Sequence, residues 1–70
     1  MMENNRLLST KQVCQITSVS RTSLWKLVTS GAFPKPVKVT PNGNRVAYVE
    51  SEVLEWIGGR IAERDREAAA

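Results

Sequence analysis

Six residues within a short run, between positions 20 and 26, carry groups that bond anionic oxygen. They are hydroxyls, cations and one indole: Ser20, Arg21, Thr22, Ser23, Trp25 and Lys26. A guanidinium can bond the edge of guanine through two nitrogens or clamp a phosphate, and hydroxyls can reach phosphates or bases. Because the run opens an expected helix, the free N–H groups at the helix start also favour an anionic oxygen. This chemistry suits contact with a nucleic acid.

A second polar and basic group lies on an expected β-hairpin and on the proline-rich segment that leads into it. Its members are Lys35, Lys38, Asn42, Asn44 and Arg45. The hairpin tip is slim enough to follow a DNA backbone or enter a minor groove about 6 Å wide. For Asn42, turn geometry is the preferred explanation. Lys38 and Arg45 extend the positive stretch of Arg21 and Lys26, so we expect them to contact DNA.

Trp25 has two possible roles. It lies about 100° around the helix from Leu24, at the edge of the apolar face. We expect it to pack under the hairpin. The alternative is that its ring lies against DNA sugar and phosphate, with the indole N–H as a donor.

Charge is distributed unevenly along the chain. Up to Arg45, seven basic residues stand against one acid, Glu3, which gives +6; after Arg45, three basic and six acidic residues give −3. Such a chain commonly meets a polyanion with its basic part. An ordinary solvated surface explains the charge alone equally well.

Other classes of function lack the residues that they need. The chain has no histidine and one cysteine, Cys14, so it offers no histidine base, internal disulfide or zinc site of ordinary ligand count. It has no glycine-rich phosphate loop. We therefore expect no enzyme activity, metal, cofactor or small-molecule ligand. The lack of a long apolar run or signal peptide predicts a cytoplasmic protein without a membrane partner.

Capping residues predict two short helices. Ser9 and Gln12 form a capping box, which predicts a first helix over residues 10–16. Its expected buried residues are Val13, Ile16 and Cys14. Ser20 caps a second helix that ends at Gly31. The apolar face of this second helix is Leu24, Leu27 and Val28.

The pattern then changes to alternating valines, which predict two strands over residues 36–40 and 45–49. Asn42-Gly43 between them is typical of a type I′ turn, in which both central residues need positive φ. A lone hairpin is marginal in water, so this one must lie against the helices.

A third helix is predicted to begin at Glu50 or Ser51. Its apolar face is Val53, Trp56, Ile57 and Ile61, with Trp56 in the core. Gly58 and Gly59 each cost about 1 kcal/mol inside a helix. The helix therefore either ends there or continues weakly.

These elements predict a mainly α fold with a small β-hairpin, a winged helix-turn-helix in the order helix, helix, hairpin wing, helix. Residues 1–7 are predicted to be a flexible N-terminus, 8–62 the winged-helix DNA-binding domain, and 63–70 a charged tail that is helix-prone or disordered. In this layout the second helix enters the major groove with its N-terminal residues leading.

Two runs, "SRTSLWKLVTSGAFPKPVK" and "VESEVLEWI", resemble the AlpA-type prophage regulators, small winged-helix relatives of phage excisionases and MerR-type DNA-binding domains. The resemblance covers about residues 6–64. Two residues depart from the usual pattern. Ser18 stands where the turn usually carries Gly, and Tyr48 stands where Trp is common.

The resemblance implies a sequence-specific, double-stranded DNA-binding protein of a prophage or integrative element. Members activate transcription of an integrase gene or act as recombination directionality factors, which bend attachment-site DNA during excision. We expect adjacent copies to bind together on DNA, and an integrase is a further candidate partner. The alternative function is a module that docks its basic face on an acidic regulatory protein and inhibits it.

Overall fold

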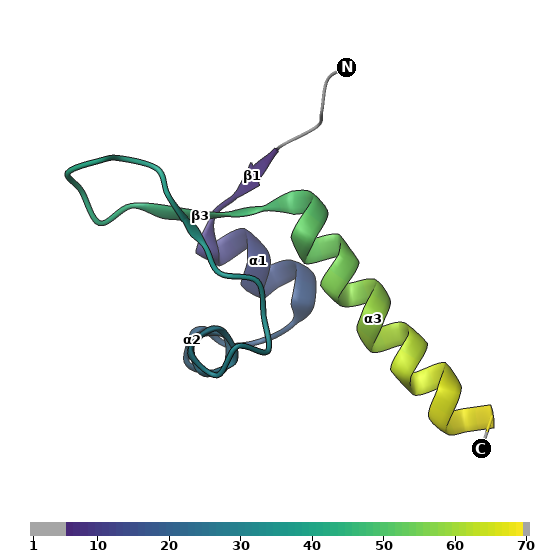
Figure 1. Ribbon diagram of the computed structural model, residues 1–70. Coiled ribbons are helices and arrows are strands. Elements are labelled where there is room, and N and C mark those ends of the chain that lie inside the picture. The colour runs from purple at the N-terminus through teal and green to yellow at the C-terminus, as the bar shows by residue number, and fades with distance from the viewer. Residues whose placement is uncertain (1–5, 70) are drawn as a thin grey trace.

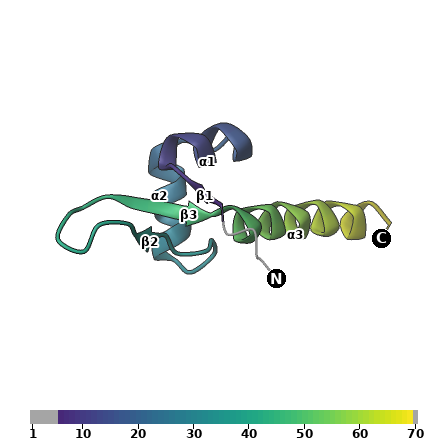
Figure 2. The ribbon, with the colours of Figure 1, turned by 90° about the horizontal axis from the view of Figure 1, so that it is seen from above.

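Three helices and a small antiparallel sheet make up the computed structural model, which describes residues 6–69. The elements are β1 (Leu7–Leu8), α1 (Thr10–Thr17), α2 (Arg21–Thr29), β2 (Val37–Lys38), β3 (Val46–Val49) and α3 (Glu50–Ala69). The strand order is β1-β3-β2. We call β2, β3 and the loop between them the wing. The wing loop and the far end of α3 lie at opposite ends of the molecule (Figures 1 and 2). The predicted winged helix-turn-helix is confirmed.

The first helix begins as its capping box predicts. The Ser9 hydroxyl accepts from the backbone N–H of Gln12 at 3.1 Å, and the Gln12 side chain accepts from the backbone N–H of Ser9 at 2.8 Å. The box satisfies two N–H groups that a helix start leaves without internal partners. On either side of the cap, Leu8 and Val13 are both buried, which is the spacing of a hydrophobic staple.

The second helix ends in a Schellman motif. The N–H of Ala32 donates to the carbonyl of Leu27 at 2.9 Å, and the N–H of Gly31 donates to that of Val28 at 3.2 Å. Gly31 has φ of +85°, a value that glycine adopts without a Cβ penalty. The motif turns the chain sharply from α2 toward β2.

The turn between α1 and α2 contains a strained residue. Ser18 caps α1 in the left-handed conformation, with φ of 61°, and is the only non-glycine residue with positive φ in residues 6–69. A side chain there costs about 1 kcal/mol. Ser18, which stands where the AlpA-type pattern usually has glycine, therefore occupies a position that favours glycine.

Strand β1 was not predicted. Leu7 pairs with Val49, and Leu8 pairs with Tyr48, both antiparallel. The carbonyl of Arg6 accepts from the N–H of Glu50 at 2.8 Å. Leu7, which the sequence analysis assigned to a flexible N-terminus, is therefore a strand residue. Residues 1–5 of that segment lie outside the described part of the chain.

The predicted type I′ turn is wrong. Neither Asn42 nor Gly43 has positive φ. Instead, the N–H of Gly43 donates to the carbonyl of Thr40 at 3.3 Å, so Pro41 and Asn42 are the central residues of the turn. A two-residue turn centred on Asn42-Gly43 needs a backbone donor at position 41, which proline lacks. The strands are correspondingly shorter than predicted, with Val37 opposite Ala47 and Lys38 opposite Val46.

Six buried side chains from different segments form the core. They are Leu8, Val13, Leu24, Phe33, Tyr48 and Val53. The ring of Phe33 contacts those of Tyr48 and Trp56 edge-on, with centroid distances of 5.8 and 4.7 Å. Trp56 is half-buried at the margin of this core, and its indole N–H donates to the carbonyl of Ala32 at 2.7 Å.

Two residues predicted to be buried are exposed. Ile16 and Ile61 each expose 46% of their surface, and they line one groove between the end of α1 and α3. No further element of residues 6–69 covers that groove. Helix α3 continues through Gly58 and Gly59 to Ala69, so it does not end at the two glycines. No helix among the described residues is long and apolar enough to cross a membrane.

Replacing Trp56 with alanine should lower the free energy of unfolding by about 3 kcal/mol, because the Phe33 contact and the bond to Ala32 are both lost. Trp56→Phe keeps a ring at the site and should lose less. Urea titration followed by far-ultraviolet circular dichroism measures both variants. An unchanged midpoint for Trp56→Ala would show that this side chain does not anchor α3.

Replacing Ser18 with glycine should raise the free energy of unfolding by about 0.5–1 kcal/mol, because the left-handed conformation then carries no Cβ penalty. Ser30→Gly is the matched control. Ser30 caps α2 with right-handed φ of −83°, so glycine there should stabilise nothing. Thermal denaturation of the two variants compares these effects, and equal shifts would contradict the explanation.

Candidate nucleic-acid interface

The start of α2 presents polar groups to solvent. The Ser20 hydroxyl accepts from the N–H of Ser23 at 3.1 Å and donates to the Ser23 hydroxyl at 3.1 Å. The backbone N–H groups of Arg21 and Thr22 lie in the first turn of α2, where the helix has no carbonyl to accept their hydrogen bonds. They therefore point outward at the positive end of the helix dipole. An anionic oxygen at this position can bond to both groups.

The predicted recognition residues form one exposed surface. Arg21, Thr22, Trp25 and Lys26 line a shallow hollow on α2, while Ser20, Ser23 and Lys26 line a second beside the turn. All six predicted recognition residues are exposed. Leu24, within the same run, is buried in the core at 1% exposure and holds the helix in place.

Trp25 does not pack under the wing as expected. It exposes 68% of its surface, because Leu24, Leu27 and Val28 form the face of α2 that packs on the core. It also borders the hollow between α2 and the wing. The indole is therefore free to contact a partner, as in the alternative role predicted for it.

A hollow joins α2 to the wing. It is lined by Thr10, Arg21, Leu24, Trp25, Val28, Pro36, Val46 and Tyr48. Neither Thr10 nor Pro36 was among the predicted interface residues. Thr10 is the first residue of α1, and this position at a helix start was the sequence signal that could have identified it. Only the packing of α1 against α2 brings it beside Arg21.

Tyr48 forms the floor of this region. It is 5% exposed, and burial raises the pKa of its phenol above the usual value, with a smaller contribution from the nearby Cys14 thiol. The phenol therefore stays neutral at physiological pH. It supplies packing to the site and no charge.

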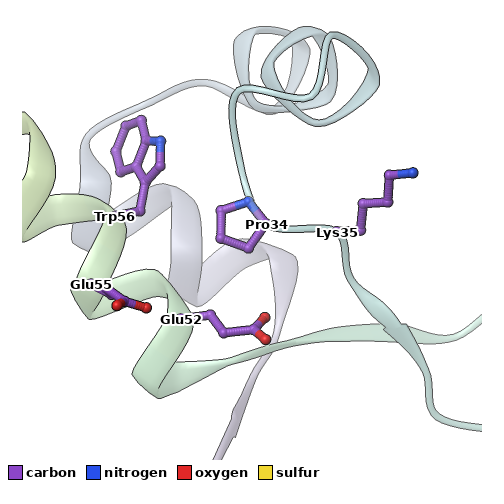
Figure 3. Close-up of a pocket in the computed structure, with 5 residues that line it drawn as sticks. All are labelled: Pro34, Lys35, Glu52, Glu55 and Trp56. Atoms are coloured by element: carbon purple, nitrogen blue, oxygen red, sulfur yellow. The ribbon is translucent and has the colours of Figure 1, made fainter.

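The wing residues divide into three positions. Lys38 and Arg45 lie on or next to its strands, and Asn42 and Asn44 lie in its loop, all four exposed. Lys35 lies apart from them, at a hollow that it shares with Pro34, Glu52, Glu55 and Trp56 (Figure 3). Figure 3 shows the Lys35 side chain directed away from the two glutamates. Lys35 therefore shares its hollow with two glutamates, although its side chain points away from both.

Within residues 6–69, the cations of the candidate interface form no ion pair with another side chain. The ion pairs among residues 6–69 use Arg6, Arg64 and Arg66. Within these described residues, none involves Arg21, Lys26, Lys35, Lys38 or Arg45. Five exposed positive groups on α2 and the wing side are thus available to an external anion.

Comparison with known proteins agrees with this arrangement. Residues 6–61 match the model of the family described as "Prophage CP4-57 regulatory protein (AlpA)". The chain is 38% identical over 61 residues to "Uncharacterized protein ORF88" of Enterobacteria phage P4, covering 87% of this chain and 67% of that protein. No solved structure matches significantly. The family match spans all three strands, α1, α2 and the first part of α3, and the chain belongs to the AlpA family of prophage regulatory proteins.

Proposed function

We propose that this protein binds double-stranded DNA of a prophage or integrative element and regulates that element. The start of α2 enters the major groove, and the wing follows the backbone or the neighbouring minor groove. The observation that carries the proposal is the set of exposed cations and hydroxyls that α2 and the wing present together, with no ion pair to these cations among residues 6–69. Membership of a family of prophage regulatory proteins supports the same conclusion.

Arg21 is the residue proposed to read a base. It is exposed at the first helical position, where the N-terminus of a recognition helix meets base edges. Lys26 lies five residues later and shares a hollow with Arg21, so it is suited to a flanking phosphate. The exposed ring of Trp25 lies between these two cations and can pack on a deoxyribose.

The regulatory role of the protein depends on which DNA sites of the element it binds. We propose that it activates transcription of an integrase gene, acts as a recombination directionality factor, or does both. One domain of this size offers a short recognition helix and few base contacts, so adjacent copies and DNA bending would add specificity. An integrase bound at neighbouring sites is the proposed protein partner.

Replacing Arg21 with alanine should lower affinity for the cognate duplex by about tenfold to a hundredfold, because a bidentate base contact is lost. The domain should stay folded, since the side chain is exposed. Arg66→Ala is the matched control: Arg66 pairs with Glu63 on α3, outside the interface. Fluorescence anisotropy with a labelled duplex measures both. Equal losses for the two variants would rule out the role of Arg21.

Footprinting on the element's attachment sites and integrase promoter tests the role itself. Protection at the promoter supports transcriptional activation, and protection at the attachment sites supports control of excision. About four to six phosphate contacts predict that log K falls with log salt with a slope of about −4 to −5. If gel shifts detected no complex even at about 50 mM salt, the DNA-binding proposal would be wrong. Docking on an acidic protein would then be the remaining explanation of the basic face.

A further inference from the structure

The two basic residues of the wing, Lys38 and Arg45, project from opposite faces of its strands. Lys38 lies directly opposite Val46 in the antiparallel pair, and side chains that lie opposite each other project to the same face. The N–H of Val39 donates to the carbonyl of Arg45 at 3.0 Å, so the pairing continues for one more residue. Because successive side chains of a strand alternate between its faces, Arg45 and Val39 share the other face.

The face of the wing that carries Lys38 is turned toward α2. Val46 and Tyr48 are two residues apart on β3, so they share one face, and both line the hollow that joins α2 to the wing. Arg21 and Trp25 line the same hollow from α2. Lys38 therefore lies on the side of the wing that faces α2, and the other wing cation lies on the side that faces away from it.

The hollow between α2 and the wing combines apolar walls with positive charge. Trp25, Pro36 and Val46 supply apolar wall, and Trp25 and Val46 expose 68% and 36% of their surface. Among the described residues that line the hollow, Arg21 is the one charged residue, and none is acidic. Within residues 6–69, neither Arg21 nor Lys38 forms an ion pair. These walls suit a ligand that has both a surface of C–H groups and a negative charge.

A strand of DNA has this combination of properties. Each deoxyribose presents C–H groups and is joined to anionic phosphates. In the proposed function the start of α2 lies in the major groove, and the wing follows the backbone or the neighbouring minor groove. One sugar–phosphate strand separates two neighbouring grooves of a duplex, so the hollow between α2 and the wing faces that strand.

Resting on the proposed function, we propose that this hollow is a subsite for one deoxyribose of the strand between the two grooves. The sugar packs on Trp25 and Val46, and Lys38 bonds to a phosphate beside it. Arg21 stays available to a base edge in the major groove. Arg45, on the opposite face of the wing, makes no contact with this strand. Contacts to sugar and phosphate fix the orientation of a protein on a duplex, so the subsite sets how α2 and the wing straddle the strand.

Lys38→Ala and Arg45→Ala test the charged contact, because each removes one exposed cation from one face of the wing. The probe is a mixed-sequence duplex of about 20 base pairs, since sugar and phosphate contacts carry no base information. In fluorescence anisotropy at about 50 mM salt, Lys38→Ala should weaken binding about threefold to tenfold. Over a salt series it should also make the slope of log K against log salt shallower by about 0.9, which corresponds to one phosphate contact. Arg45→Ala should leave the slope unchanged, and equal changes in slope for the two variants would overturn the subsite.

Val46→Ala and Val39→Ala test the apolar contact. Both valines are exposed, and they lie on opposite faces of the wing, so each variant loses the same atoms from a different face. Val46→Ala should weaken binding to the same duplex about threefold to tenfold, because methyl groups that pack on the sugar are lost. Val39→Ala should bind as the unaltered protein does, and neither change should alter the salt slope, since no charge is removed. Circular dichroism should show that both variants are folded, and undiminished binding by Val46→Ala would refute the apolar contact.

Binding by the unaltered protein separates the subsite from the proposed function. If the unaltered protein binds the duplex and the two members of each matched pair lose affinity equally, the subsite is wrong and the DNA-binding function stands. If the unaltered protein does not bind the duplex even at about 50 mM salt, the subsite and the proposed function are both wrong.

Discussion

One buried side chain from each of six segments meets at the centre of this domain. Leu8, Val13, Leu24, Phe33, Tyr48 and Val53 come from β1, α1, α2, the connection to β2, β3 and α3 in turn. With so little chain to bury, each segment is held by about one anchor and by its neighbours in the sheet. The exposed residues of α2 are therefore placed by Leu24, and those of the wing by Tyr48. Whatever displaces one anchor displaces the surface attached to it.

Local backbone chemistry fixes the angles between these segments. The capping box sets the entry into α1, and the Schellman motif at Gly31 sets the exit from α2. Between them, the left-handed Ser18 makes the sharp turn that brings the start of α2 beside Thr10. A strained residue is tolerated there because helices anchored on both sides determine the turn. The geometry of the candidate interface thus depends on turns as much as on the core.

Features set by local chemistry could be predicted from the sequence, and features set by packing could not. Ser9, Ser20 and Gly31 mark their helix ends because each acts through bonds to its own neighbours. Strand β1 has too few residues for any periodicity, so only its pairing with β3 reveals it. The predicted type I′ turn does not form because Pro41, just before Asn-Gly, lacks the backbone donor that this turn needs. Trp25 lies at the edge of an apolar face, where small differences in packing decide between burial and exposure.

The basic surface of α2 and the wing and the exposed apolar side chains of α3 differ in how water solvates them. Cations on α2 and the wing can stay hydrated until a polyanion replaces their counterions, so their exposure costs little. The leucine and isoleucines of α3 have no such favourable exposed state. Helix α3 also continues through two glycines, where helix propensity opposes it. Most helical stability in proteins comes from packing an apolar face. Val53, Trp56 and Ile57 supply this packing in the first half of α3, whereas Leu54 and Ile61 stay exposed.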